Sequence, residues 1–154
     1  MLPPDPVRVG SALVEAALVN HRGPTLGYRI SDGGAVLTYL PDHEPALGQD
    51  LAHDPGEWIS GWGLARDASL LIHDAQYTPD EYAGTRGWGH SMVGDALAFA
   101  RRADAERIAL FHHDPTRDDE HLDAMGAEAA DAWTAGGGAR QGALVAREGL
   151  ALEL

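Results

Sequence analysis

The sequence predicts an α/β fold in which β-hairpins are followed by a β-α-β-α-β succession. Three observations predict it. Two strand-like segments flank the turn sequence Asp32-Gly33-Gly34 in the first 40 residues. Further along, two short and almost wholly apolar segments, residues 69–72 and 107–111, read as buried strands. Two stretches with helix-starting signals and an apolar stripe follow these strands.

The amino-terminal part of the chain reads as strands and turns. Residues 1–6 form a Pro-rich lead that we expect to be extended, and residues 7–20 hold one long strand or two short ones. Residues 25–31 and 35–40 predict a hairpin. Residues 41–66 show little periodicity and predict a long loop with a short helix near Trp58.

Helices and strands alternate in the remainder. Residues 80–83 predict one helical turn, and Ser91 predicts the N-cap of a helix that ends near Ala103. Asp118, followed by two further acidic residues, predicts the start of a second helix, which the glycines at 136–138 end. Two closing strands are expected at 142–147 and 150–153, with a turn at 148–149. We therefore expect residues 1–154 to form a single α/β unit.

Composition excludes several classes of function. The 154 residues carry 24 Asp and Glu against 11 basic residues, all of them Arg, for a formal net charge of -13. Strong binding to nucleic acid or to an anionic membrane needs basic patches, so neither partner is expected. The chain contains no Cys, which excludes disulfides and thiolate chemistry. With neither a signal peptide nor a long apolar stretch in the sequence, we expect a cytoplasmic protein.

Five clusters of polar residues follow a predicted strand or precede a predicted helix: residues 20–23, 39–44, 72–75, 87–91 and 112–114. In open α/β sheets, sites form at the carboxyl ends of the strands. Imidazole and carboxylate groups are ligands for zinc-like or manganese-like ions. Each cluster also has a structural interpretation, as a turn, a loop residue or a helix start. Five clusters at the same kind of position favour one shared polar site.

The same clusters resemble the metallo-β-lactamase-fold hydrolases, in particular the phosphodiesterase-like branch that includes the tRNA 3′-processing endonucleases. The resemblance covers about residues 7–147, and its motifs occur in the order of that family. The segments that carry it are Asn20-His21-Arg22-Gly23, Tyr39-Leu40-Pro41-Asp42-His43-Glu44, Leu71-Ile72-His73-Asp74-Ala75, Gly87-Trp88-Gly89-His90-Ser91 and Leu110-Phe111-His112-His113-Asp114.

The resemblance implies a role for each matching residue. His21 would bind one metal ion, Asp42 would bridge two, and His112 would bind the second. His90 would lie beside the substrate phosphate as a proton or hydrogen-bond donor, and Asp74 would orient it. The implied cofactor is a divalent metal, up to two ions of zinc, with manganese or iron as alternatives. Met92 stands where the family usually has Thr.

The His-x-His-x-Asp-His motif of the family is absent from this sequence. Because that motif belongs to the amino-terminal half of a four-layer αββα sandwich, the chain resembles the carboxyl-terminal half. A catalytic zinc normally has three protein ligands, whereas His21, Asp42 and His112 would supply only two to each ion. Three ligands around one ion would form a two-His, one-carboxylate set, which also suits ferrous iron.

Two functions follow as hypotheses. The first is a hydrolase that cleaves a phosphodiester or related ester with a metal-activated water. The acidity of the chain favours a small substrate over RNA. The second is a non-catalytic, truncated remnant that acts as an assembly module, because half of a sandwich exposes an apolar sheet face. Its partner would be a second copy of the chain or a complementing amino-terminal half.

Overall fold

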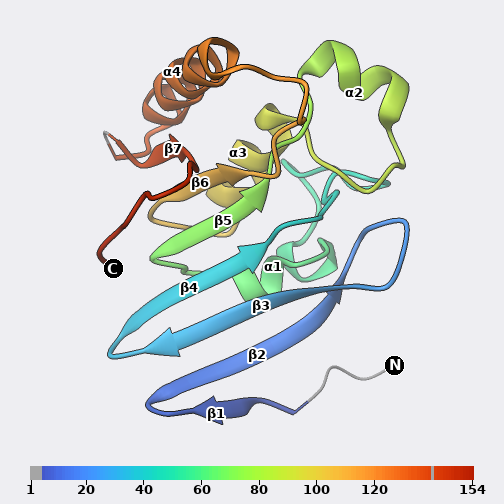
Figure 1. The fold of residues 1–154 in the computed structure, drawn as a ribbon. Helices are drawn as coiled ribbons and strands as arrows, with labels where there is room; N and C mark the ends of the chain where they lie inside the picture. The colour runs from blue at the N-terminus through green and yellow to red at the C-terminus, as the bar shows by residue number, and fades with distance from the viewer. Residues whose placement is uncertain (1–4, 140) are drawn as a thin grey trace.

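The computed structural model describes residues 5–139 and 141–154, and these residues build one seven-stranded sheet (Figure 1). The strands lie in sequence order: β1 (Val7–Val9), β2 (Ala12–Val19), β3 (Thr25–Asp32), β4 (Ala35–Leu40), β5 (Leu70–Asp74), β6 (Ile108–Phe111) and β7 (Ala143–Val145). The pairs from β1 to β4 are antiparallel and those from β4 to β7 are parallel. The predicted α/β class, with hairpins before β-α-β-α-β, is confirmed.

Glycine turns produce the antiparallel half of the sheet. Residues 7–20 form two strands, and Gly10 between them has a φ of 63°. Gly33 and Gly34 have φ values of 59° and 94°, which suits the tight turn between β3 and β4. The predicted extended lead at 1–6 lies mostly outside the described residues; Asp5 and Pro6 are in no regular element.

The helices connect the parallel strands: η1 (Gly56–Trp58), α1 (Trp62–Ala65), α2 (Pro79–Thr85), α3 (Val93–Arg102) and α4 (Asp119–Ala135). Asp118 caps α4 by accepting a hydrogen bond from the His121 amide at 2.9 Å, as the sequence predicted. The predicted N-cap of α3 is wrong. Met92 occupies that position, because the Ser91 hydroxyl instead donates to the His43 carbonyl at 2.6 Å.

Two strand boundaries also differ from the prediction. β5 continues through His73 and Asp74, which pair with Leu40 of β4 and Phe111 of β6. Both residues therefore belong to the strand rather than to the loop after it. Residues 150–153 form no strand. β7 spans only three residues, so a returning segment has little partner backbone to pair with.

Helices α1, α3 and α4 pack against the sheet, and α1 and α3 lie on its rear face in Figure 1. The core on that face joins strand residues such as Val19, Leu40 and Leu110 to Phe99 of α3 and Trp133 of α4. Because paired residues of neighbouring strands share a face, the strand register assigns a second set of apolar side chains to the opposite face. That set, called the outer face below, comprises Val7, Val9, Val14, Leu18, Leu26, Tyr28, Ile30, Leu37, Tyr39, Ile72 and Phe111.

Among the described helices, none is both long enough and apolar enough to span a lipid bilayer.

Candidate metal centre

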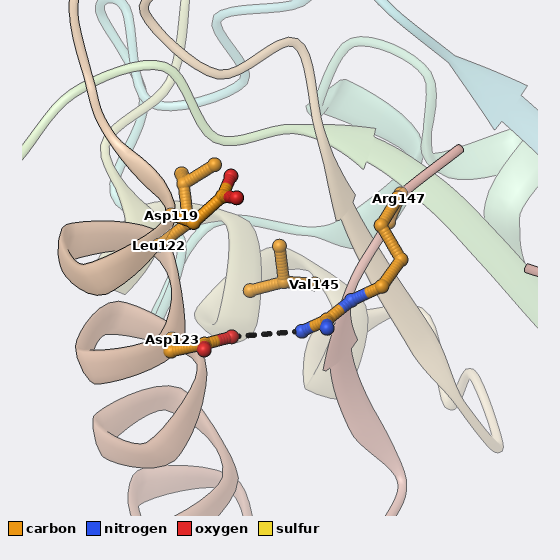
Figure 2. A pocket seen from close by; sticks show the side chains of 6 residues that line it. Asp119, Leu122, Asp123, Val145 and Arg147 are labelled. Atoms are coloured by element: carbon orange, nitrogen blue, oxygen red, sulfur yellow. Dashed lines mark hydrogen bonds and ion pairs between the residues drawn. The ribbon is translucent and has the colours of Figure 1, made fainter.

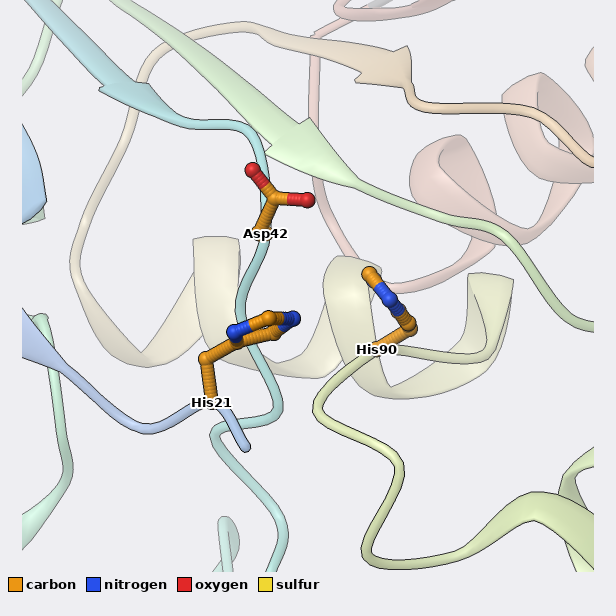
Figure 3. Close-up of side chains that lie close together, drawn as sticks. All are labelled: His21, Asp42 and His90. Atoms are coloured by element: carbon orange, nitrogen blue, oxygen red, sulfur yellow. The ribbon is translucent and has the colours of Figure 1, made fainter. Parts of the chain in front are cut away.

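Four polar side chains meet where the parallel strands end. Asp42 follows β4 and His112 follows β6, whereas His21 follows β2 and His90 lies in the loop between α2 and α3. Figure 3 shows His21, Asp42 and His90 around one space. Parallel strands bring their carboxyl ends to the same edge of a sheet, and this edge is where such sites form.

Asp74 is the buried centre of the site. Its Oδ2 atom lies 2.6 Å from Nδ1 of His90, and its Oδ1 atom accepts from the amides of Gln76 and Ser91, both at 3.1 Å. Burial raises the pKa of Asp74, but hydrogen bonds from His112 and His90 outweigh it, and the net pKa lies below its usual value. The ionised carboxylate only accepts, so Nδ1 of His90 carries the proton and Nε2 stays available.

His112 lies between two carboxylates. Its Nδ1 atom is 3.3 Å from Oδ2 of Asp74 and 3.3 Å from Oδ1 of Asp42. The hydrogen bond to Asp74 raises the pKa of His112, with a further contribution from Asp42. The backbone of His112 has a φ of 57°, a left-handed conformation that is uncommon outside glycine and concentrates at functional sites. This turn at the end of β6 brings the ring within 4.7 Å of the His90 ring, centroid to centroid.

His21 is oriented by the loop that contains it. Its Nδ1 atom lies 2.9 Å from the Thr25 hydroxyl, which donates to the Gly23 carbonyl at 3.2 Å. The Gly23 amide also donates to this Nδ1 atom at 3.3 Å, so the loop engages Nδ1 and leaves Nε2 as the nitrogen that can face another ligand. The His21 ring meets the His90 ring edge-on at 5.1 Å. Gly89 passes so close that a side chain there would collide with His21.

The donor atoms fit a divalent metal. The ligand atoms of His21, Asp42 and His90 all lie within 4.8 Å of one another, and so do those of Asp74, His90 and His112. Imidazole nitrogen with carboxylate oxygen is the donor set of many zinc sites. Of the three ligands predicted from the sequence, Asp42 lies near both His21 and His112. His21 and His112 fall into different groups, and His90 belongs to both.

A buried layer that the sequence pattern does not predict lies behind these residues. Nδ1 of His43 lies 2.9 Å from Nε2 of His73, and Nδ1 of His73 lies 2.7 Å from the Asp74 carbonyl. Both rings are fully buried, and burial lowers the pKa of each. Glu44 is also buried. These residues occur in the polar clusters, but their burial depends on packing between distant segments. His53 and His121, in contrast, are exposed.

A separate pocket lies between α4 and β7, away from the histidines (Figure 2). It has a volume of about 200 Å³, and an ion pair between Arg147 and Asp123 at 2.9 Å crosses its rim. Both partners are largely exposed, and exposed pairs of this kind contribute little to stability. The pocket is a surface feature of the α4–β7 packing.

The sequence of this chain matches a known protein family. Residues 4–113 match the model of the beta-lactamase superfamily domain. Ribonuclease Z of Salinibacter ruber is 35% identical over 79 residues, which cover 51% of this chain and 21% of that protein. Ribonuclease Z of Sulfurisphaera tokodaii is 33% identical over 99 residues, which cover 62% of this chain and 32% of that protein.

Solved structures agree on the fold. The metallo-beta-lactamase fold protein YhfI from Bacillus subtilis superposes with a TM-score of 0.71 at 21% identity, over 97% of this chain and 53% of that one. The short form of human tRNase Z superposes with a TM-score of 0.55 at 26% identity, over 70% of this chain and 38% of that one. The chain thus spans about half of YhfI, and smaller shares of the two Ribonuclease Z relatives.

Proposed function

The chain belongs to the beta-lactamase superfamily domain family, and on that premise we propose that it is a metal-dependent hydrolase that cleaves a phosphodiester or related ester. The observation that carries the proposal is the short contact between Asp74 and His90 beside His21 and Asp42. A hydrogen-bonded acid and imidazole next to metal-ligand groups is what metal-assisted hydrolysis requires.

The proposed ligands are His21, Asp42 and His112, and they would hold up to two ions, zinc first and manganese or iron as alternatives. A bound divalent ion supplies Lewis acidity and lowers the pKa of water. Asp74 holds the Nδ1 proton of His90, and a second proton on Nε2 of His90 would pass to the leaving-group oxygen as its bond to phosphorus breaks. In this proposal His90 assists the leaving group and Asp74 orients it.

The charge of the chain supports a small substrate. The net charge of -13 repels a long polyanion such as RNA, and all of the positive charge comes from 11 arginines. Arg22 follows His21 and lies over the Trp88 ring at 6.0 Å, which places one cation beside the candidate centre. One guanidinium is enough for a single phosphodiester but supplies no extended basic surface. A cytoplasmic location belongs to the same proposal.

A second candidate function is assembly, and the outer face favours it. The exposed large apolar side chains that come from β1, β2 and β3 all lie on this face: Val7, Val9, Leu18, Leu26 and Tyr28. Contiguous apolar surface of this kind marks an interaction site. The superposition covers 97% of this chain but only 53% of YhfI, so YhfI contains further polypeptide of similar size. We propose that the occupant is a complementing amino-terminal half, with a second copy of the chain as the alternative.

Turnover of bis(p-nitrophenyl) phosphate tests the hydrolase proposal. The chain is assayed alone and with the amino-terminal half of a relative supplied in trans, with zinc or manganese present. We expect poor turnover alone and faster turnover in the complemented sample. Asp42→Ala removes the shared ligand and should abolish the reaction, whereas Asp131→Ala, an exposed acid on α4, should leave it unchanged. Equal rates for the two variants would contradict the proposal, and faster cleavage of RNA than of the diester would reassign the substrate.

A further inference from the structure

Glu44 is a buried carboxylate to which neither the sequence nor the family comparison assigns a role. Its side chain is 1% exposed. Oε1 accepts from the Tyr82 hydroxyl and from the Gly87 amide, both at 2.8 Å, and Oε2 accepts from the Gly89 amide at 2.8 Å. An ionised carboxylate is costly to bury, and three donors of this kind are what stabilise it.

The three donors are neutral, so the arrangement is built to hold a loop rather than to neutralise a charge. Burial raises the pKa of Tyr82, and the hydrogen bond to Glu44 raises it further, so that the hydroxyl keeps its proton and remains a donor. Gly87 and Gly89 have φ values of 85° and 98°, conformations that glycine adopts freely. A loop with two such glycines is flexible unless its amides are fixed.

The backbone of Glu44 fixes a second loop. Its amide donates to the Asn20 carbonyl at 2.9 Å, and the Asn20 side chain donates back to the Glu44 carbonyl at 3.0 Å. Asn20 precedes His21, and Glu44 follows Asp42 by two residues. One residue thus joins the three segments that carry His21, Asp42 and His90.

We infer that Glu44 is a positioning residue that fixes the loop of residues 86–90 and thereby places His90 against Asp74 and His21. The catalytic importance of this inference rests on the proposed function. The hydrogen bonds of Glu44 that carry it do not depend on that function. His90 follows Gly89 directly, and Gly89 also packs against the His21 ring. If Glu44 no longer holds the amides of Gly87 and Gly89, the loop can move. The His90 ring can then leave Asp74 and His21.

The test uses the metal-free chain of residues 1–154 and solution NMR. In Glu44→Gln the side chain keeps its size, but one acceptor oxygen is replaced by an NH2 group, which donates and therefore repels the donor that it faces. Gly87 and Gly89 bond to different oxygens of Glu44, so we expect amide hydrogen exchange to accelerate by roughly 10- to 100-fold at whichever of the two then faces the NH2 group. The His90 Nδ1–H signal should broaden or disappear. The Leu71 amide, which donates to the Arg107 carbonyl in the core, should exchange at its unchanged rate.

Tyr82→Phe is the matched control, because it removes one donor and leaves both glycine amides on Glu44. Its exchange rates at Gly87 and Gly89 should stay close to those of the unchanged chain. Should Glu44→Gln fail to fold, Glu44→Asp gives the same comparison, since it keeps the charge but shortens the reach. An unchanged His90 signal in the Glu44 variant would overturn the inference. Equal acceleration at Leu71 would also overturn it, because Glu44 would then support the whole fold.

These signals need neither metal nor turnover, so they separate the role of Glu44 from the proposed hydrolysis. In protein that turns over the diester, Glu44→Gln should lower kcat while KM and metal content are retained. Loss of metal together with rate would assign Glu44 to the support of the ligands and overturn its role in placing His90.

Discussion

Oδ2 of Asp74 and Nδ1 of His90 lie 2.6 Å apart, although 16 residues separate them in the chain. The contact forms because β5 ends at Asp74 and the loop after α2 returns over that strand end. It fixes which nitrogen of His90 carries the proton, since an ionised carboxylate only accepts. Nε2 is then the nitrogen that Asp74 leaves without a contact, and the His90 ring lies 5.1 Å from the His21 ring, centroid to centroid.

His90→Ala tests what that nitrogen does. If His90 is a general acid, kcat for a phosphodiester should fall by roughly 10²–10⁴-fold while the metal content stays unchanged. Rate and metal content are measured on the same sample, because His90 also lies within ligand distance of both groups of donors. Loss of metal in step with rate would make His90 a ligand instead.

Acidification should destabilise the metal-free chain through His43 and His73. Burial lowers the pKa of both histidines in the folded state, whereas in the unfolded chain they titrate near about 6.5. Below that pH the unfolded state takes up protons that the folded state cannot, so the free energy of unfolding falls as pH falls. Each histidine contributes up to about 1.4 kcal/mol per pH unit.

Urea unfolding at pH 7 and pH 5 measures this effect. His112 acts in the opposite direction, because its pKa is raised and its contribution is lost as pH rises through the folded value. We expect the two buried histidines to outweigh it. His53→Gln, at an exposed position, should keep the pH dependence. A chain equally stable at both pH values would show that the buried pair accepts protons readily.

Leu18→Glu tests the outer face as a contact surface. Leu18 is 50% exposed on that face, and a carboxylate there should weaken association. Sedimentation velocity at micromolar concentration should show association of the unchanged chain and a monomer for the variant. Leu47→Glu, at an exposed position in the loop after β4, should associate like the unchanged chain. A compact monomer in every sample would contradict the assembly proposal.

Local signals were enough for much of the fold. The turn between β3 and β4 rests on adjacent glycines, and the start of α4 rests on the Asp118 side chain, so both were predictable from neighbouring residues. The carboxyl end of β5 was not predictable from neighbouring residues, because His73 and Asp74 belong to the strand only through pairing with β4 and β6. The position of Ser91 before an apolar stripe predicts a helix cap, but its hydroxyl donates to a carbonyl 48 residues away.

In the candidate site, too, some features follow from local sequence and others depend on contacts between distant residues. Polar clusters at strand ends and before a helix predicted one shared site, because strand ends expose side chains at one edge. The resemblance to the metallo-β-lactamase-fold hydrolases selected His21, Asp42, Asp74, His90 and His112 within those clusters. The role of Glu44 depends on amides 43 and 45 residues further along the chain. No pattern near Glu44 reveals those partners, since the packing of α2 against the loop after β4 creates the contact.

Zinc titration by calorimetry tests the central claim, which is that His21, Asp42 and His112 share a metal site. The account predicts weak binding by the chain alone, since each ion lacks at least one protein ligand, and tighter binding when a complementing amino-terminal half is added. Asp42→Ala should remove zinc binding in both samples, while Asp131→Ala should bind as the unchanged chain does. Zinc binding by Asp42→Ala that equals that of the unchanged chain would contradict the account.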